Sequence, residues 1–326
     1  MLVLGREDLR KVVTVELALR AAREAFAALG GGTARVPRRI HLETPHGVSL
    51  VMPAFGEAGD AVGVKIVNVT PANSERGLPT VQGLVLLFDE ATGTPRALLE
   101  GTYLTQVRTG AAIGLAADLL ARPDAETVAL FGAGATARTS LWAIQAVRAI
   151  REVRVCQPHP ERFPAFAQDL RDLLGADCPA LRRVSDPREA IRGADIVVTA
   201  TTASTPVFPG EALEPGSFVG ALGAYRPDTR ELDTATIQRS RLIVDSRESA
   251  LAEAGDVVIP LREGAIDPTH LTAELGEVLL GQAPGRESPD DIVVFKSVGN
   301  AIQDLTLAVL AYRSARESGV GSDIDL

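Results

Sequence analysis

A glycine-rich turn between two short apolar runs is the feature of this sequence that points most directly to chemistry. The run 127–131 enters Gly132-Ala133-Gly134-Ala135-Thr136-Ala137, and a helix-compatible stretch then leads to a second β-branched run at 153–156. Strand, tight turn, helix and strand form the context in which G-x-G-x-x-G/A binds a dinucleotide. Gly132 permits the sharp turn, Gly134 removes a Cβ that would block a pyrophosphate, and the helix N-terminus offers unpaired N–H groups. An ordinary βα turn is the alternative, but the flanking strands favour a cofactor site.

The residues after the second run qualify the identity of that cofactor. An NAD-binding site normally has Asp or Glu near the end of this strand to hold the ribose 2′-hydroxyl. Gln157 stands where the acid is expected, and a neutral side chain does not repel a 2′-phosphate, which His159 or Arg162 could meet. Arg162 could equally be a solvated residue on the next helix. The sequence therefore predicts NADP(H) or NAD(H), with a preference for NADP(H).

Cations stand in unexpected surroundings in the first part of the chain. Lys65 lies in the apolar run 61–69, which predicts a buried strand, and a buried lysine needs an anionic partner or a lowered pKa. Arg38 and Arg39 precede a strand-like run, so one of them would face inward, and Arg108 begins a helix poor in other charges. Alternatively, Lys65 could lie on an edge strand and point to water, and Arg108 could form a structural ion pair. Together, without a Ser-His-Asp, zinc or paired-carboxylate signature, they indicate a substrate carboxylate held by cations.

The composition is typical of a two-domain enzyme. The chain has 326 residues, of which 46% are hydrophobic, and a net charge of -9, which argues against a nucleic-acid partner. Two cysteines are too few for a disulfide framework and predict the reducing cytoplasm. The N-terminus becomes charged too early for a signal peptide, and no apolar run approaches the length of a membrane span. The four histidines lack metal-ligand spacing, so we expect no metal.

The alternation of elements predicts an α/β fold with a Rossmann-type doubly wound sheet in residues 122–299. Its expected strands are 127–131, 152–156, 181–184, 194–200, 217–222, 241–245 and 291–295, with helices that include 162–174 and 246–254. Residues 1–121 and 300–326 are expected to form the second domain. Its expected helices are 15–29, 104–121 and 300–318, its strand-like runs are 38–43, 48–53, 61–69 and 81–88, and the tail 319–326 is expected to fray.

Several further blocks carry a family resemblance that runs in order from about residue 14 to 316. They are Val64-Lys65-Ile66-Val67-Asn68 with Pro71-Ala72-Asn73 and Leu78-Pro79-Thr80, then Arg108-Thr109-Gly110-Ala111-Ala112, the block 220–232, and Val294–Gly299. In these blocks the chain resembles the ornithine cyclodeaminase/mu-crystallin family. The resemblance implies a Rossmann domain plus a smaller α/β domain for substrate binding, through which members form homodimers.

The resemblance also implies a role for each matching residue. Arg39, Lys65 and Arg108 would bind the substrate carboxylate, with Lys65 close to the reacting carbon and Arg38 as the alternative to Arg39. The residues that would touch the cofactor are Thr80, Arg108, Ala135, Thr136, Gln157, Thr201, Ala221, Leu222 and Ser297, beside Gly132 and Gly134 of the turn.

One departure from the family pattern bears on the reaction. Cyclodeaminases have an acid/base aspartate in the block 220–232, where this chain has Tyr225, and Asp228 follows three residues later. Tyrosine, with a pKa near 10, is a poor general base at neutral pH. The departure favours a reductase of cyclic ketimine carboxylates, such as 1-pyrroline-2-carboxylate, that uses NAD(P)H. The alternatives are an ornithine cyclodeaminase or alanine dehydrogenase-like enzyme, in which Asp228 could act, and a non-catalytic NADP-dependent protein that binds a small ligand.

Overall fold

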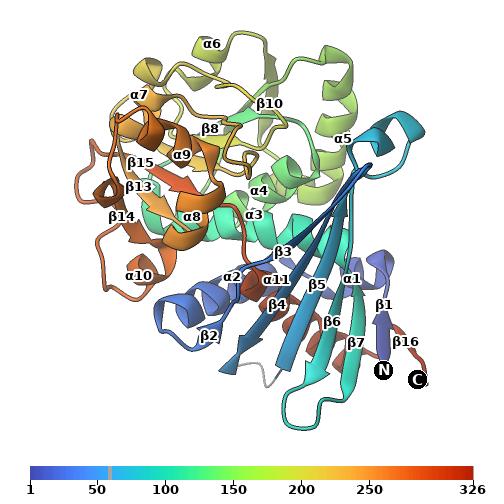
Figure 1. The fold of residues 1–326 in the computed structure, drawn as a ribbon. Helices are drawn as coiled ribbons and strands as arrows, with labels where there is room; N and C mark the ends of the chain where they lie inside the picture. Colours follow the sequence, from blue (N-terminus) through green and yellow to red (C-terminus); the bar gives the residue numbers. More distant parts are fainter. Residues whose placement is uncertain (58–60, 326) are drawn as a thin grey trace. The chain divides into compact units, whose positions relative to one another are not determined.

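The computed structural model describes residues 1–57 and 61–325, with the side chain of Ser74 left out. Its internal contacts divide the chain into two compact units. Unit 1 comprises Met1–Arg108 and Asn300–Leu326, and unit 2 comprises Thr109–Gly299. The described residues of each unit contain one eight-stranded sheet (Figure 1). Over the described residues, no helix has both the length and the apolar character needed to cross a membrane.

Unit 2 is built on a parallel sheet with the strand order β10-β9-β8-β11-β12-β15-β13-β14. The strands are β8 (Thr127–Phe131), β9 (Glu152–Cys156), β10 (Ala180–Val184), β11 (Ile196–Thr199), β12 (Phe218–Ala221), β13 (Ser240–Val244), β14 (Leu271–Glu274) and β15 (Ile292–Lys296). The first five strands along the chain, β8 to β12, lie in the sheet as β10-β9-β8-β11-β12. The order therefore reverses between β8 and β11. Doubly wound sheets bind dinucleotides at the carboxyl ends of the strands at this switch point. The predicted Rossmann-type sheet is therefore present, with β14 as an additional strand.

The helices of unit 2 connect these strands and leave their central residues fully buried. They are α4 (Ala135–Gln145), α5 (Phe163–Leu174), α6 (Pro187–Ile191), α7 (Thr234–Gln238), α8 (Arg247–Glu253), α9 (Gly255–Arg262) and α10 (Leu275–Leu279), with short 3-10 turns at Pro160–Arg162, Gly175–Asp177, Gly210–Ala212 and Pro268–His270. Val128, Val197 and Val294 have no exposed surface. Such apolar strands, covered on both faces, are what a parallel sheet requires.

The division of the chain falls earlier than the sequence suggested. We expected the Rossmann-type domain to begin at residue 122, at the Arg122-Pro123 break, whereas the contacts place Thr109 onward in unit 2. Helix α3 (Gly101–Leu120) therefore contributes its later turns to unit 2. The reason is close packing: a Cβ on Gly110 would lie 2.3 Å from the carbonyl carbon of Thr139 in α4, so only glycine allows this approach. Pro123 therefore follows the end of helix α3 but does not mark the boundary between the two units.

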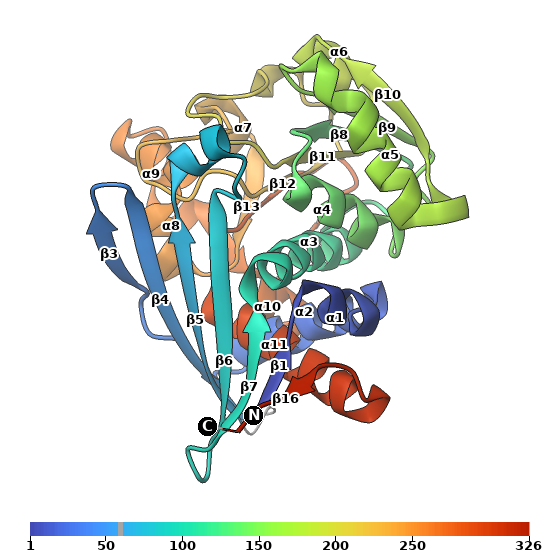
Figure 2. The ribbon, with the colours of Figure 1, turned by 90° about the vertical axis from the view of Figure 1, so that its right-hand side faces the viewer.

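Unit 1 is a mixed sheet with the order β16-β1-β7-β6-β5-β4-β2, in which β3 also pairs with β4. The strands are β1 (Leu2–Leu4), β2 (Ala34–Arg35), β3 (Ile40–Thr44), β4 (Gly47–Gly56), β5 (Ala61–Val69), β6 (Val81–Asp89), β7 (Pro95–Glu100) and β16 (Ser322–Asp323), and the helices are α1 (Arg6–Val12), α2 (Val15–Gly30) and α11 (Ala301–Ser318), with a 3-10 turn at Pro71–Arg76. Figure 2 shows β3 to β7 side by side. Helix α11 packs against β4, β5 and β6 and against α2.

The two faces of this sheet differ in burial. Alternate residues of β5, among them Lys65 and Val67, are buried toward α11, while the residues between them point the other way. Cross-strand pairing places apolar residues together on that second face, which we call the open face; it comprises Ile40, Leu42, Val51, Pro53, Val64, Ile66, Leu84, Leu86 and Leu98. Ile40, Leu42 and Leu84 are 50% exposed or more. A contiguous apolar face of this kind is typical of an interaction surface.

The two ends of the chain pair with each other in unit 1. The prediction that the tail frays is wrong for the described residues, because β16 pairs with β1 and the amino group of Met1 donates to the carbonyl of Ile324. Backbone pairing between the two chain ends was not visible in local sequence pattern.

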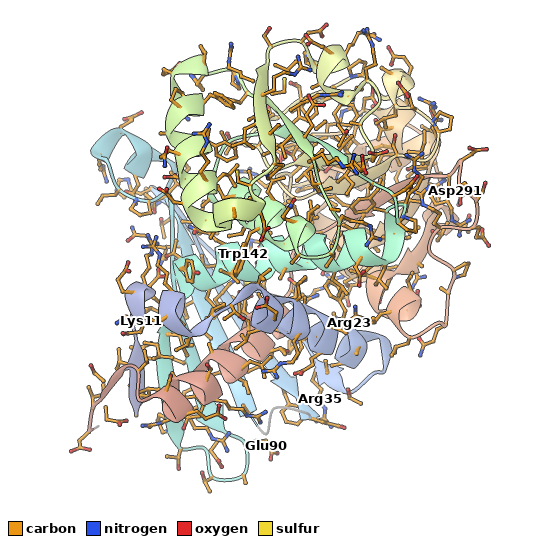
Figure 3. All side chains as sticks on the ribbon, turned by 180° about the vertical axis from the view of Figure 1, so that it is seen from behind. Lys11, Arg23, Arg35, Glu90, Trp142 and Asp291 are labelled. Carbon is orange, nitrogen blue, oxygen red and sulfur yellow. The ribbon has the colours of Figure 1, made fainter. Side chains whose placement is uncertain are left out.

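Charged side chains lie on the outside of this unit, among them the exposed Lys11, Arg23, Arg35 and Glu90 (Figure 3).

Candidate active site

A buried ion cluster in unit 1 contains two of the predicted site residues. The Lys65 Nζ lies 2.8 Å from Oδ2 of Asp304, and the Arg108 Nε lies 3.2 Å from Oδ1 of the same carboxylate. Lys65 is 2% exposed, Asp304 1% and Arg108 9%. Because β5 lies between β4 and β6, the edge-strand explanation for Lys65 is wrong. Two cations on one carboxylate leave one positive charge, which a single substrate carboxylate would balance.

The environment of Lys65 makes its charge responsive to pH. Burial lowers the pKa of Lys65 to about 8, the Asp304 carboxylate opposes this effect, and the cations of Arg108 and Arg39 add to it. Arg39 is half-buried, whereas Arg38 is exposed. The structure thus places Arg39 within electrostatic reach of Lys65, as expected if Arg39 rather than Arg38 belongs to this cluster.

The start of helix α11 completes the cluster and was missed by the sequence analysis. Gln303 accepts a hydrogen bond from the Arg108 guanidinium at 2.7 Å through its Oε1, and the same oxygen accepts the Asn300 N–H at 3.4 Å. Asp304 is the next residue of the helix. A possible signal was the pair Gln303-Asp304 in an otherwise apolar stretch of the helix, since buried polar residues need partners.

In unit 2, the predicted dinucleotide turn has the required backbone. Gly132 has φ +103°, and a Cβ there would meet the Ala200 carbonyl oxygen at 2.5 Å, so glycine is required. At Gly134, the N-cap of α4, a Cβ would meet no atom of the described residues within 4 Å, apart from its chain neighbours. The space beside Gly134 is therefore open, and the first N–H groups of α4, which begins with Ala135 and Thr136, face no capping side chain from that residue.

Gln157, which directly follows β9, is buried, and its side chain bonds the backbone of its own loop. Its Oε1 accepts the His159 N–H at 3.0 Å and its Nε2 donates to the His159 carbonyl, so the side chain closes its own turn. The His159 ring is exposed and lies 3.3 Å from Glu161, and Arg162 is exposed. Gln157 thus shapes the loop, and the side chains of His159 and Arg162 beside it are at the surface.

A set of buried carboxylates holds the loops at the carboxyl ends of the parallel strands. The Glu231 carboxylate accepts hydrogen bonds from the Thr199 hydroxyl, from the N–H and hydroxyl of Thr201, and from the Gly223 N–H, at 2.6 to 2.9 Å. Burial raises the pKa of Glu231. Asp245 likewise accepts from the Ser297 hydroxyl at 2.7 Å. These contacts fix Thr201 and Ser297, two predicted cofactor residues.

A buried ion pair supports the same region. Lys296, the last residue of β15, lies 2.7 Å from Asp256, and neither side chain is exposed. Asp256 also accepts the N–H groups of Glu231 and Leu232 at 2.7 and 2.8 Å. The sequence analysis singled out neither this pair nor Glu231 and Asp245. For Lys296 and Asp245 the signal was a charge within or directly after an apolar strand, whereas Glu231 lies in a loop and Asp256 in α9, where no such signal exists.

The remaining predicted residues are distributed over strand ends and loops. Ala221, the end of β12, is buried, Leu222 follows it half-buried, and Thr80 is exposed just before β6. Tyr225 is 39% exposed. Asp228 is exposed and lies 3.4 Å from the exposed Arg226, so the buried acid of this loop is Glu231 rather than Asp228.

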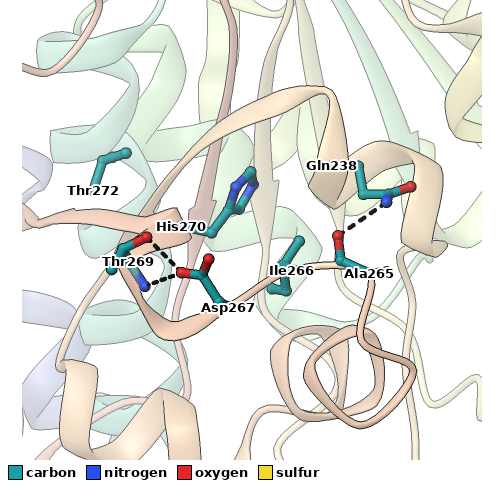
Figure 4. A pocket seen from close by; sticks show the side chains of 7 residues that line it. All are labelled: Gln238, Ala265, Ile266, Asp267, Thr269, His270 and Thr272. Carbon is teal, nitrogen blue, oxygen red and sulfur yellow. Dashed lines mark hydrogen bonds between the residues drawn. The ribbon is translucent and has the colours of Figure 1, made fainter.

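A hollow of about 410 Å³ in unit 2 lies at the amino ends of β13 and β14. Figure 4 shows the side chains that line it. It is lined by the residues before and at the start of β14, including Asp267 and His270. Asp267 accepts from the N–H and hydroxyl of Thr269, and the His270 ring lies 2.7 Å from the Ile237 carbonyl. Its polar side chains are thus used within the protein, and the amino edge of a parallel sheet is not where dinucleotides bind.

Comparison with known proteins relates the chain to one family over its whole length. The family model described as the ornithine cyclodeaminase/mu-crystallin family matches residues 1–319. A Delta(1)-pyrroline-2-carboxylate reductase of Bacillus cereus is 39% identical over 328 residues, which cover 100% of each chain.

Two solved structures are similar to both units. The Thermococcus litoralis Delta(1)-pyrroline-2-carboxylate reductase in complex with NADH and L-proline has a TM-score of 0.95 and 42% identity, covering 99% of this chain and 100% of that chain. An archaeal alanine dehydrogenase dimer with bound NAD has a TM-score of 0.92 and 33% identity, covering 100% of this chain and 99% of that chain. The chain therefore belongs to the ornithine cyclodeaminase/mu-crystallin family.

Proposed function

We propose that this protein is an NAD(P)H-dependent oxidoreductase that reduces the C=N bond of cyclic ketimine carboxylates, of the 1-pyrroline-2-carboxylate and 1-piperideine-2-carboxylate type. The observation that carries the proposal is the buried cluster of Lys65, Asp304 and Arg108, with its one uncompensated positive charge. Full-length similarity to pyrroline-2-carboxylate reductases supports the same reaction.

The residues of unit 1 provide binding and orientation. Lys65, Arg108 and Arg39 bind the substrate carboxylate, and Lys65 lies next to the reacting carbon. A protonated ketimine is already electrophilic, so the protein needs chiefly to orient it, and orientation contributes much of the rate in such reactions. NAD(P)H, when bound, supplies the hydride for the C=N carbon.

The residues of unit 2 fit a dinucleotide. The open space beside Gly134 and the N–H groups at the start of α4 suit the pyrophosphate. The cofactor contacts that we propose are made by Thr80, Arg108, Gly132, Gly134, Ala135, Thr136, Gln157, His159, Arg162, Thr201, Ala221, Leu222 and Ser297. Glu231 and Asp245 position Thr201 and Ser297 for this role through the hydrogen bonds described above.

A panel of cyclic imino acids, assayed by the loss of nicotinamide absorbance, tests the function. Turnover of a cyclic ketimine carboxylate supports the reductase. Tight cofactor and ligand binding without turnover would instead indicate a protein that sequesters a small ligand. Turnover of pyruvate with ammonia but not of a cyclic ketimine would indicate an alanine dehydrogenase.

We expect the wild-type protein to reduce a cyclic ketimine and to release no ammonia from ornithine. Cyclodeamination moves protons on and off nitrogen during two redox half-reactions, and Tyr225 is a poor base for this. Asp228 is the other candidate, but it is exposed and paired with Arg226. Ammonia should be measured with ornithine and lysine in the wild type and in Asp228→Asn. Robust ammonia release that this substitution abolishes would reassign Asp228 as the acid/base.

Cofactor choice is proposed to be permissive, with a preference for NADP(H). Gln157→Asp should shift the preference toward NAD(H) by about tenfold or more, since a carboxylate repels the 2′-phosphate (about 1.4 kcal/mol per tenfold). Gln157→Asn is the matched control, because it shortens the side chain equally without adding charge. Titration of both cofactors into the three proteins measures the shift. Equal NADP(H) affinity in the two variants would place residue 157 away from the ribose.

Carboxylate binding should weaken above pH 8. Since folding lowers the pKa of Lys65 from 10.5 to about 8, the unfolded chain holds more protons between these values. The free energy of unfolding therefore rises with pH across this window, while the ligand-binding charge is lost. The dissociation constant of furan-2-carboxylate, which has no group titrating there, should rise above pH 8 and should not do so in Lys65→Arg. A constant value up to pH 10 in the wild type would show that the Lys65 charge does not bind the carboxylate.

Assembly and location complete the proposal. We propose a cytoplasmic homodimer that associates through the open face of unit 1, with neither nucleic acid nor membrane as partner. The exposed apolar side chains of that face support association. The dimer described for the archaeal alanine dehydrogenase is consistent with it.

A further inference from the structure

Two buried carboxamides at the start of α11 carry hydrogen-bonding atoms that the protein does not use. Asn300, the N-cap of α11, is 6% exposed, and among the described residues neither its Oδ1 nor its Nδ2 has a partner. Gln303 is 2% exposed, and its Nε2 likewise has no partner within the described part of the chain. A buried polar group without a partner destabilises the folded protein. Such atoms are expected where a ligand supplies the missing partner.

These atoms lie at the cation cluster of unit 1. The Oε1 of Gln303 accepts both the Asn300 N–H, at 3.4 Å, and the Arg108 guanidinium, at 2.7 Å. Arg108 in turn shares Asp304 with Lys65. The backbone of Asn300 is therefore linked, through two hydrogen bonds to one oxygen of Gln303, to Arg108, to which we assign carboxylate binding.

The acceptors already present in this cluster are engaged. The two oxygens of Asp304 face Lys65 and Arg108, and the Oε1 of Gln303 has two donors. The Thr105 hydroxyl donates to the Gly101 carbonyl at 2.6 Å and lies 3.5 Å from Lys65. Of these acceptors, the Oδ1 of Asp304 has the Arg108 cation at 3.2 Å but no hydrogen bond, whereas among the described residues the Oδ1 of Asn300 has no partner of either kind.

A protonated cyclic ketimine has one polar group besides its carboxylate, the N–H of the C=N bond. We propose that Asn300 binds this N–H through its Oδ1 and so selects imines over 2-oxo acids, which carry a C=O in the same place and have no donor there. The assignment rests on the proposed function for the identity of the substrate. A carboxamide suits the task because it accepts the hydrogen bond without a negative charge that would repel the neighbouring carboxylate.

A pair of planar inhibitors tests the hydrogen bond without turnover. Pyrrole-2-carboxylate has an N–H beside its carboxylate, whereas furan-2-carboxylate has nearly the same shape and no donor. Calorimetry on the cofactor-loaded wild type should show the pyrrole acid binding about 3- to 10-fold more tightly, the range expected for one neutral hydrogen bond. In Asn300→Ser this ratio should fall to about one. Serine is an equally good N-cap, so the helix start is retained.

Two further variants separate binding from folding. Asn300→Asp keeps the acceptor, so the pyrrole acid should remain preferred, while both acids bind more weakly because of the added charge. Asn68→Ser is the matched control: Asn68 is exposed on β5 and its side chain contacts Ser49, so the ratio should equal that of the wild type.

The outcomes distinguish this inference from the proposed function. A ratio near one in the wild type, or an unchanged ratio in Asn300→Ser, overturns the role of Asn300 even if the protein reduces cyclic ketimines. The expected ratios in a protein that reduces no ketimine support the Asn300 contact and overturn the proposed reaction. Failure of the wild type to bind either acid overturns the Asn300 contact, while the ketimine turnover assay decides the proposed reaction separately.

Discussion

Replacing Lys65 by alanine is expected to remove most of the reductase activity and to leave dinucleotide binding intact. Lys65 is a fully buried cation that faces Asp304, and removing one charged donor from such a site costs about 2–4 kcal/mol of transition-state stabilisation. This corresponds to roughly a 30- to 1,000-fold loss in kcat/KM. Cofactor affinity should change little, because the dinucleotide turn belongs to unit 2. Steady-state kinetics and a cofactor titration measure the two quantities.

A matched lysine and a chemical rescue show whether the loss is local. Lys11 is exposed on α1 and lies 3.8 Å from Asp8, so Lys11→Ala should retain wild-type kinetics. Added methylammonium should restore part of the activity of Lys65→Ala if the missing charge causes the loss. Near-normal kcat/KM in Lys65→Ala would exclude Lys65 from the reaction.

Placing a charge on the open face is expected to convert the proposed homodimer into monomers. Ile66 lies near the centre of that face, between Val51 and Leu84, and is 39% exposed. Ile66→Glu would bury an unpaired carboxylate in the interface. This makes the free energy of association less favourable by several kcal/mol, which favours the monomer. Sedimentation velocity on the wild type and the variant measures the molecular mass.

The control for this prediction lies on the same unit but off the open face. Glu90 is exposed in the turn between β6 and β7, so Glu90→Ala should leave the mass unchanged (Figure 3). A thermal melt of Ile66→Glu close to that of the wild type shows that the fold is retained, since Ile66 points away from the buried face of the sheet. A monomeric wild type, or a dimeric Ile66→Glu, would show that the open face does not hold two copies together.

Long and strongly patterned elements were predictable from the sequence. The strands β8, β9 and β5 and the helices α2 and α11 lie within a residue or two of the predicted ranges. Short elements were missed, among them β7, which begins with Pro95, and β14, which has four residues and contains the polar Thr272. Such segments carry too little periodicity to be recognised, and pairing with a neighbouring strand decides their conformation.

The sequence by itself determined the dinucleotide turn, the alternation that requires a doubly wound sheet, and the presence of a buried lysine, because each is a property of neighbouring residues. Only the tertiary structure decided which groups meet that lysine. Asp304 follows Lys65 by 239 positions, and helix α11 brings it to β5 together with Asn300 and Gln303. The tertiary structure also showed that Glu231, rather than Asp228, is the buried acid of its loop. Local pattern encodes which residues are buried, whereas the identity of their partners depends on how distant elements pack.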